Sequence, residues 1–343
     1  MGERIAVVGA GVIGLSIAHE LATAGRRVTV LADLEPLETT SAIAGAVWFP
    51  YAAERSAAVD TMLATTLARL TALATHEPDA GIDLRRGLII ERSPDPDRSW
   101  TTMLRATEVH ASDLPAFGVA AAALGAGATA MSTTAPLATM SLYLPWLRAR
   151  CAALGVRFER RVVDDVDALA HDFDVVVVAA GARGGALLGD DANVVPVRGQ
   201  VVRVEHPGVD GFGIDGFGID GFGIDGLGID AFVIDDENPA GLTYVLPRRD
   251  CVVLGGTHDV GATSLEPDPA TEAAIIERCE ALVPAVAGQR ILSRAVGLRP
   301  GRATLRIEEV PRRALRVIAA YGHGGSGMTL SWGTAERVAA LLG

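Results

Sequence analysis

Residues 4–33 read RIAVVGAGVIGLSIAHELATAGRRVTVLAD and decide the fold of this 343-residue chain. Residues 4–10 are a short apolar run rich in β-branched side chains, which is typical of a buried strand. Residues 13–25 repeat apolar side chains with a helical period and end at a glycine, and residues 26–33 predict a second strand. Strand, glycine turn, helix and strand in this order predict the first unit of a nucleotide-binding α/β domain.

The glycines of the turn, Gly9, Gly11 and Gly14, have the GxGxxG spacing. The first permits a tight turn, the second lets the backbone approach a pyrophosphate, and the third lets the helix pack closely on the strand. Amides at the helix N-terminus then face the phosphates. Asp33 ends the second strand, where an acidic side chain accepts hydrogen bonds from an adenosine ribose. The pattern predicts a bound dinucleotide and leaves NAD and FAD open.

The C-terminal stretch, residues 320–342, reads AYGHGGSGMTLSWGTAERVAALL and bears on which dinucleotide binds. A glycine cluster from Gly322 to Gly327 precedes a predicted helix. Such a helix N-terminus offers bare N–H groups and the positive end of the helix dipole. These suit the edge of a flavin, which becomes anionic on reduction, so the stretch favours FAD. The alternative is a glycine-rich loop that only leads into a closing helix.

A third apolar run, FDVVVVAAGARGGALL from Phe173, predicts another buried strand followed by a glycine turn. We expect this strand to return to the first sheet after a long excursion of the chain. The nucleotide-binding domain is then discontinuous, and a second domain is built from the rest. The predicted division assigns residues 1–50, 140–195 and 290–343 to the nucleotide-binding domain and residues 51–139 and 196–289 to the second domain.

Composition excludes several classes of function. The net charge of −12 disfavours a nucleic-acid partner, because phosphate binding needs clustered cations. All 30 basic residues are arginines, so Schiff-base and lysine-base mechanisms are excluded. The absence of a long apolar run and of a secretory leader predicts no membrane span and a cytoplasmic protein. We expect no metal site, and we expect Cys151, Cys251 and Cys279 to be buried thiols in a reducing compartment.

Seven collinear segments resemble the D-amino acid oxidases and together cover nearly the whole chain. In order they are GAGVIGLS, TTSAIAGAVWFPY, VVVVAAGARGGAL, VRGQVVRV, GLTYVLPRRDCVVLGGT, VGLRPGRATLRIE and YGHGGSGMTLSWG. The resemblance implies an α/β fold with a glutathione-reductase-like FAD-binding Rossmann domain and an α+β substrate domain with a mixed or antiparallel sheet. It also implies an oxidase, in which a D-amino acid loses its α-hydrogen as hydride to FAD. The imine product hydrolyses to a 2-oxo acid and ammonia, and O2 becomes hydrogen peroxide.

The resemblance also assigns site residues. Arg299 matches the arginine that binds the substrate carboxylate, and its planar fork can make two parallel charge-assisted bonds. Tyr244 matches the tyrosine whose hydroxyl supports the same carboxylate, and Gly325 matches the glycine whose carbonyl accepts from the substrate amine. This set orients a substrate without abstracting a proton. The residues expected to bind FAD are Gly9, Ala10, Gly11, Ile13, Gly14, Asp33, Thr40, Ser41, Gly45, Ala46, Val47, Val163, Gly324, Gly325, Ser326, Gly327, Met328 and Thr329.

The chain departs from the family pattern at three positions. The family often has arginine directly after the ribose-binding acid, where this chain has Leu34, so one phosphate or adenosine contact is expected to be missing. Mammalian members carry a second tyrosine four residues before the carboxylate-binding tyrosine, and here that residue is Ala240. The residue after Gly325 is Ser326 rather than the aromatic residue of the family pattern. We therefore expect a wider or more open pocket.

Several other polar and aromatic residues near these motifs have less specific interpretations. We expect His323 to pack beside the flavin and His258 to be an ordinary loop residue rather than a general base. Arg302 and Arg306 are expected to face solvent or form ion pairs, although Arg302 lies close enough in sequence to line the pocket. Two positions are open for Trp48 and Tyr51. They can lie in the core, or they can border the flavin and the substrate cavity.

Residues 211–230 read GFGIDGFGIDGFGIDGLGID, four copies of a five-residue unit. We interpret the repeat as a local expansion, ordered as a longer rim loop or a twisted hairpin, between a strand ending at His206 and one starting at Gly241. A lid that tunes substrate access is the alternative. Calcium is disfavoured because the calcium-binding nonapeptide repeat has a longer unit.

Other functions are compatible with the sequence. A glycine oxidase or an oxidase for D-aspartate is the nearest alternative, and an acidic substrate would need an additional cation, for which Arg248 and Arg249 are the candidates. An FAD-dependent D-amino acid dehydrogenase, or a non-catalytic flavoprotein disabled by the repeat, also remains open. The expected partners are a small-molecule D-amino acid and O2, and the candidate assembly is a homodimer.

Overall fold

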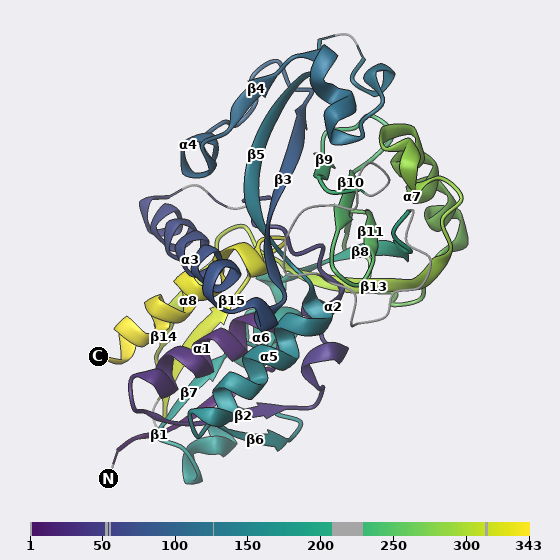
Figure 1. Cartoon of the computed structure of the whole chain (residues 1–343). Coiled ribbons are helices and arrows are strands. Elements are labelled where there is room, and N and C mark those ends of the chain that lie inside the picture. Colours follow the sequence, from purple (N-terminus) through teal and green to yellow (C-terminus); the bar gives the residue numbers. More distant parts are fainter. Residues whose placement is uncertain (1, 52–53, 55, 126, 208–228, 313–314) are drawn as a thin grey trace.

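The computed structural model describes residues 2–51, 54, 56–125, 127–207, 229–312 and 315–343. These residues form two β-sheets that occupy opposite ends of the molecule, one in the lower and one in the upper half of Figure 1. The chain passes between the two ends several times. Most of the repeat at 211–230, including its predicted order as a loop or hairpin, lies outside the described residues.

The first sheet has six strands in the order β14-β15-β7-β1-β2-β6. Its strands are β1 (Arg4–Val8), β2 (Arg27–Ala32), β6 (Arg157–Arg160), β7 (Val175–Val178), β14 (Arg306–Val310) and β15 (Arg316–Tyr321). All neighbours are parallel except β14 and β15. The strands predicted at 4–10, 26–33 and after Phe173 are thus confirmed, and the third lies directly beside the first. Because both faces of a parallel sheet are covered, these strands are continuously apolar rather than alternating.

Helices α1 (Val12–Thr23), α5 (Met140–Ala153) and α8 (Gly327–Leu342) pack together against the first sheet. Helix α1 is apolar on most sides because it contacts β1, α5 and α8 at once, and it buries Leu15, Ile17 and Leu21. Helix α8 is the predicted C-terminal helix. The N-terminal glycine turn and the C-terminal glycine cluster therefore begin two helices that are packed on each other.

The second sheet has nine strands, with the path β12-β8-β11-β10-β9-β3-β5-β4 and β13 paired to β8. Its strands are β3 (Ile82–Glu91), β4 (Thr107–Val109), β5 (Thr129–Ala138), β8 (Val195–Val204), β9 (Phe232–Asp235), β10 (Thr243–Pro247), β11 (Val252–Gly255), β12 (Asp259–Val260) and β13 (Ile291–Gly301). The sheet is mixed, since β3 and β9 are parallel and the other pairs are antiparallel. This agrees with the expected second sheet.

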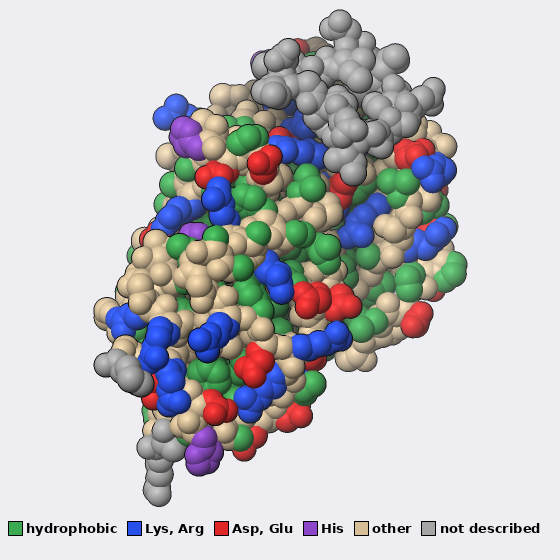
Figure 2. Space-filling view, turned by 60° about the horizontal axis from the view of Figure 1, so that its bottom comes forward, with side chains coloured by type: hydrophobic (Ala, Val, Ile, Leu, Met, Phe, Trp, Pro, Cys, Tyr) green, Lys and Arg blue, Asp and Glu red, His purple; other side chains and the backbone are tan. Residues whose placement is uncertain are grey.

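The remaining helices lie around and between the sheets. They are α2 (Thr40–Ile43), α3 (Ala57–His76), α4 (Thr101–Leu104), α6 (Gly184–Leu188) and α7 (Pro269–Leu282), together with short 3-10 turns at Pro36–Glu38, Pro78–Ala80, Ala111–Phe117, Ala121–Ala123, Asp167–His171, Gly181–Arg183, Asp191–Asn193 and Pro284–Val286. None of the described helices is long and apolar enough to cross a membrane. On the face that Figure 2 shows, arginine side chains are intermixed with acidic ones.

Two sequence expectations need adjustment. Strand β13, which the predicted division places in the nucleotide-binding domain, pairs with β8 in the second sheet, and the chain returns to the first sheet only at β14. The reason is that β13 pairs with β8 from Ile291 to Gly301, with one register shift between Ile291 and Ser293. The strand that first follows the repeat is β9 rather than β10, and β11 and β10 lie between β8 and β9 in the sheet.

Candidate functional site

The N-terminal glycine turn is closed so tightly that two of its positions admit no side chain. Gly9 has a φ of +115°, and a Cβ there would lie 2.5 Å from the carbonyl oxygen of Ala179. A Cβ on Gly14 would lie 2.0 Å from the carbonyl oxygen of Gly9. A Cβ on Gly11 would lie 3.0 Å from Oγ of Ser41. The turn thus packs helix on strand through bare backbone, as the spacing predicts.

Ser41 connects the turn to a segment that the sequence places beside the cofactor. Its Oγ accepts a hydrogen bond of 3.0 Å from the amide of Val12, which is the first residue of α1. Helix α1 has no side-chain cap from Gly11 itself, so Ser41 satisfies one of its free amides. Of the other predicted residues of the turn, Ala10 is buried and Ile13 is partly buried against the core.

Asp33 lies just past β2 and forms an ion pair that the sequence did not indicate. Nη1 of Arg183 is 2.8 Å from Oδ2 of Asp33, and its Nη2 is 3.2 Å from Oδ1 of Asp164. Val163 is buried beside these residues, in the core cluster that includes Leu31. A cation therefore stands next to the predicted ribose-binding acid although Leu34 replaces the family's arginine, because Arg183 reaches it from the turn after β7.

Residues 45–47 are held at the edge of the second sheet. A Cβ on Gly45 would lie 2.5 Å from Cδ1 of Leu246, and Ala46 has a positive φ of 65°. The amide of Ala138 donates to the Ala46 carbonyl over 3.0 Å, and Val47 forms a bridge with Leu137. The preceding helix α2 contacts β13, where Oγ1 of Thr40 donates to the Leu298 carbonyl over 3.3 Å. Contacts with β5, β10 and β13 thus attach the segment to the second sheet, and Ser41 of α2 connects it to α1.

The C-terminal glycine cluster docks on residues 49–51. Oγ of Ser326 donates to the Tyr51 carbonyl over 2.5 Å, and Oγ1 of Thr329 donates to the Phe49 carbonyl over 2.9 Å. A Cβ on Gly325 would lie 2.7 Å from Cδ1 of Tyr51. Because the Ser326 hydroxyl is used in this way, it does not cap α8. Gly327 opens the helix with free space around it, and Met328 turns into the core.

A cavity of about 200 Å³ lies beside this cluster. Its walls include Glu54, His258, Arg299, Arg302, Gly324 and Gly325. Arg299 and the two glycines, which are far apart in sequence, are thus brought to one site. The turn at residues 9–14, Asp33 and Val163 lie elsewhere, at the carboxyl ends of β1, β2 and β6. A ligand that contacted both regions would have to be long.

Arg299 extends across β8 rather than into bulk solvent. Its Nη1 donates to the Thr257 carbonyl over 2.9 Å, and its guanidinium lies above Gly199, where a Cβ would be 2.5 Å from Nη2. Tyr244 approaches from β10 with its ring against Gly255, where a Cβ would be 2.1 Å from the ring Cζ. Burial raises the pKa of Tyr244, and the charge of Arg299 opposes this. Tyr244 is partly buried and is not among the described residues that line the cavity.

Tyr51 and His258 form a pair at the cavity. The Tyr51 hydroxyl is 3.0 Å from Nδ1 of His258, and the rings meet edge to face. Burial and the charge of Arg299 both lower the pKa of His258, so its neutral form is favoured. His258 does follow β11 in a loop, as expected, but it also lines the cavity. No local pattern around residue 258 could have indicated a contact with residue 51.

The other histidine at the site, His323, also lines the cavity but is almost completely buried. Nε2 of His323 is 2.9 Å from Oγ1 of Thr334 in α8, and burial lowers the pKa of His323 to about 3. The imidazole is therefore neutral and supports the glycine cluster. Trp48 is completely buried in the core. Tyr51 is half-buried and packs against Gly325, which lines the cavity.

The remaining arginines near the site have partners. Arg302 and Arg306 each lie 3.1 Å from Oδ2 of Asp190, as the ion-pair expectation predicts, although Arg302 also lines the cavity.

The idea that Arg248 or Arg249 receives an acidic substrate is not supported. Arg248 is buried, contacts Asp250 and donates to the Ala44 carbonyl, while Arg249 pairs with Asp83. Neither is among the described residues that line the cavity.

The three cysteines are buried and free, as predicted. Burial raises the pKa of Cys151 and Cys279 to about 12 and that of Cys251 to about 11, so these thiols are poor nucleophiles. In the described part of the chain, no group of three or more His, Cys, Asp or Glu side chains is arranged to hold a metal ion.

These features fit an extended dinucleotide. The backbone at Gly9 and Gly14 leaves α1 free to present its amides, Asp33 lies one strand away, and an uncapped helix N-terminus borders the cavity at the other end. Such a fold and site define a dinucleotide-dependent oxidoreductase. The family model described as FAD dependent oxidoreductase matches residues 4–341, and the chain belongs to this family.

Individual relatives place the chain within this family. A D-amino-acid oxidase of Rubrobacter xylanophilus is 39% identical over 344 residues, which cover 99% of this chain and 96% of the relative. A human D-aspartate oxidase is 32% identical, with 99% of this chain and 94% of the relative covered. The solved structure of glycine oxidase from Geobacillus kaustophilus has a TM-score of 0.76 at 21% identity and covers 99% of this chain and 94% of that one. The structural likeness concerns the fold.

Proposed function

We propose that this protein oxidises neutral D-amino acids. One D-amino acid, O2 and water give a 2-oxo acid, ammonia and hydrogen peroxide. The observation that carries the proposal is that Arg299 and Gly325 line the same cavity, which is bordered by the helix N-terminus of the C-terminal glycine cluster. The curated relative with the higher identity is a D-amino-acid oxidase, which favours this substrate class.

We assign the cavity residues by the chemistry that each can supply. The guanidinium of Arg299 binds the substrate carboxylate, since a planar fork can make two charge-assisted bonds to it. The hydroxyl of Tyr244, which comes from β10, supports the same carboxylate. The carbonyl of Gly325 accepts from the substrate amine. None of these groups removes a proton, so the protein contributes by fixing the position and face of the substrate Cα.

We assign the cofactor residues to two regions. Gly9 to Gly14 and Ser41 hold the pyrophosphate, and Asp33 with Val163 holds the adenosine. Residues 45–47 and 324–329 surround the flavin ring, where the amides of α8 face its pyrimidine edge. Bound FAD supplies the acceptor for the hydride that leaves the substrate Cα. The assigned domain that holds it consists of residues 1–50, 140–195 and the C-terminal part of 290–343.

Neutral substrates are favoured by the charges around the cavity. Arg248 and Arg249 are held by Asp250 and Asp83, so they are not available for a second carboxylate. Glu54 borders the cavity with its carboxylate accepting from the amide of Leu305, and it would repel an acidic side chain. The assigned compartment is the cytoplasm, where the buried thiols stay reduced.

Anaerobic reduction tests the proposal. The purified yellow protein should lose its flavin absorbance with D-alanine or D-valine and keep it with the L-enantiomers, and in air it should consume O2 and form hydrogen peroxide. Bleaching by D-aspartate or glycine alone would favour the related oxidases. Bleaching without O2 uptake would favour a dehydrogenase.

Arg299→Leu tests the carboxylate assignment. Loss of the charge-assisted bonds should lower kcat/KM by about 1,000-fold, while FAD stays bound because Arg299 is not among the residues predicted to bind it. Arg290→Leu, which removes an exposed arginine paired with Glu205, is the matched control and should behave as the wild type. Unchanged turnover in Arg299→Leu would refute the assignment.

A further inference from the structure

The segment that carries His258 joins β8 through a β-bulge. Strand β11 pairs with β8 up to Gly255 opposite Val201, and the pairing resumes with Asp259 opposite Arg198. Residues 256–258 therefore stand opposite only residues 199–200. Bulges of this kind redirect side chains and often lie beside active sites. Here the bulge places the Thr257 carbonyl against the guanidinium of Arg299.

The hydroxyl of Thr257 takes the place of backbone hydrogen bonds to β8 that the bulge interrupts. Its Oγ1 accepts from the amide of Gln200 over 3.1 Å and donates to the Arg198 carbonyl over 3.4 Å. Gln200 is completely buried. An amide left there without an acceptor would carry an uncompensated desolvation cost. The hydroxyl thus fixes residue 257 on the strand that Arg299 crosses.

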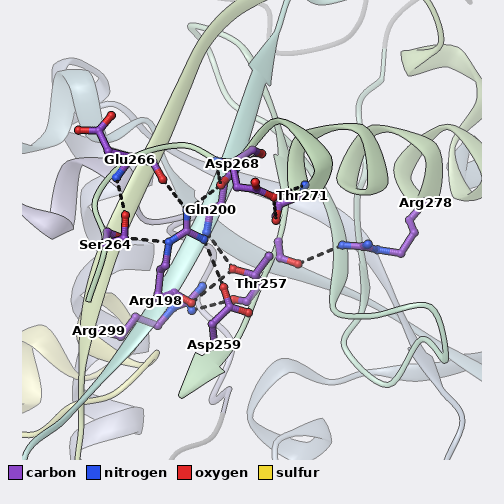
Figure 3. A network of polar contacts seen from close by, with 11 residues as sticks. Arg198, Gln200, Thr257, Asp259, Ser264, Glu266, Asp268, Thr271, Arg278 and Arg299 are labelled. Carbon is purple, nitrogen blue, oxygen red and sulfur yellow. Dashed lines mark hydrogen bonds and ion pairs between the residues drawn. The ribbon is translucent and has the colours of Figure 1, made fainter. Parts of the chain in front are cut away.

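Two buried side chains of β8 hold the rest of the segment (Figure 3). Arg198 donates to the carbonyls of Ser264 and Glu266 over 3.0 and 2.8 Å, and its Nη1 lies 3.2 Å from Oδ2 of Asp259. Gln200 bonds both the amide and the carbonyl of Asp268 at 2.9 Å. Nη2 of Arg198 also donates to Oε1 of Gln200 over 2.9 Å. Residues 257–268 are therefore attached to β8 along their length.

We propose that Thr257, held by Arg198 and Gln200, is a positioning residue that sets the orientation of Arg299 over Gly199. The inference rests on the proposed role of Arg299 as the carboxylate-binding residue. Arg299 begins on β13 on one side of β8 and reaches the bulge on the other side. Gly199 gives the guanidinium room, and the Thr257 carbonyl fixes one of its edges. The N–H groups that face the cavity are then presented to a substrate in one orientation.

The test compares Thr257→Val, which removes the hydroxyl at similar volume, with Thr257→Ser, which keeps it. Pyruvate, a 2-oxo acid that cannot be oxidised at its Cα, is titrated into each FAD-loaded protein while the flavin spectrum is followed. We expect Thr257→Val to weaken pyruvate binding about tenfold and raise KM for D-alanine similarly, with kcat changed less than about threefold. Thr257→Ser should restore both, and FAD affinity should stay unchanged in both variants.

Thr271→Val is the matched control, because it removes another hydroxyl of the same network. Oγ1 of Thr271 bonds Asp268 at the start of α7, away from Arg299. This variant should lower the melting temperature without changing pyruvate affinity. If Thr257→Val binds pyruvate like the wild type, or if both valine variants weaken pyruvate and FAD together, the proposal is overturned.

Gly199→Ala gives a second test that does not depend on the folding of Thr257→Val. Its methyl group would occupy the place of the guanidinium, and the flexible side chain of Arg299 is the part that can move. We expect pyruvate binding to weaken at least about tenfold with FAD retained; unchanged binding would contradict the proposal.

Arg299→Leu separates the positioning role of Thr257 from the proposed function. If it leaves pyruvate binding intact, the proposed function fails. If it abolishes binding while Thr257→Val and Gly199→Ala do not affect it, only the positioning role fails.

Discussion

The glycine turn at residues 9–14 and the cavity around Arg299 are both built from close contacts, but of different kinds. In the turn, Gly14 meets the carbonyl of Gly9, and backbone packs on backbone within a few residues. At the cavity, Arg299 meets the Thr257 carbonyl and Tyr51 meets His258, which are side-chain contacts over long sequence separations. The turn has its shape because side chains are absent, whereas the cavity has its shape because particular side chains are held by others.

This difference implies that the two regions fail in different ways. A side chain added to the turn has nowhere to go, because the atoms it meets are backbone atoms of the central strand and its loop. A side chain changed at the cavity disturbs one arm of a hydrogen-bond network and leaves the first sheet intact. We therefore expect changes in the turn to abolish cofactor binding and changes at the cavity to alter affinity or pH dependence alone.

Gly14→Ala should have the largest effect. Its Cβ would lie 2.0 Å from the Gly9 carbonyl oxygen, so α1 must move away from β1. Overpacking of this kind costs roughly 1–3 kcal/mol or more, and the displaced helix no longer presents its amides correctly. We expect the FAD dissociation constant, measured by quenching of flavin fluorescence, to rise at least about 100-fold.

Gly25→Ala is the control at the other end of the same helix. Gly25 has a φ of +77° and open space around its Cα, so alanine there costs only about 1–2 kcal/mol of backbone strain. This variant should melt at a lower temperature and bind FAD as the wild type does. Equal loss of FAD in both variants would show that stability, rather than the geometry of the turn, controls cofactor binding.

The same difference explains what the sequence could predict. The turn, its strands and α1 could be predicted from local sequence patterns, because Gly9, Gly11 and Gly14 lie within one short segment. Arg299 and Gly325 could be assigned only by resemblance to a family. The Tyr51–His258 pair joins residues 207 positions apart, and the Asp33–Arg183 pair joins residues 150 apart. Such contacts depend on the order of strands in the two sheets, which no local pattern determines.

Arg183→Leu should have an intermediate effect on the nucleotide side. Removing the guanidinium leaves Asp33 without its 2.8 Å partner and removes a positive charge from the predicted adenosine site. The pair is half exposed, so the effect is modest. We expect FAD binding to weaken about fivefold at low salt and less at high salt, as measured by equilibrium titration.

Leu34→Arg combined with Arg183→Leu sharpens this test. Leu34 is exposed and follows Asp33 directly, so an arginine there can supply the charge from the neighbouring position. We expect the double variant to regain most of the lost affinity. Arg161→Leu, which breaks the nearby pair with Asp172, is the control and should not change FAD binding. Full FAD affinity in the single variant Arg183→Leu would mean that this arginine does not contribute to FAD binding.

The pH dependence of carboxylate binding should show the smallest effect, and it belongs to the cavity alone. Burial and Arg299 lower the pKa of His258, whereas Asp259 raises it, and the ring is neutral above that pKa. A carboxylate bound at Arg299 favours the protonated ring, so pyruvate, which stays ionised, should bind about threefold more tightly as the pH falls through the pKa of His258. Because the pKa of His258 lies below its ordinary value of about 6.5, flavin absorbance titrations from about pH 7.5 down to about pH 4.5 measure this. His258→Asn should abolish the dependence without changing FAD affinity. If the dependence persists in His258→Asn, another group near Arg299 titrates instead, and His258 has no electrostatic contact with the bound carboxylate.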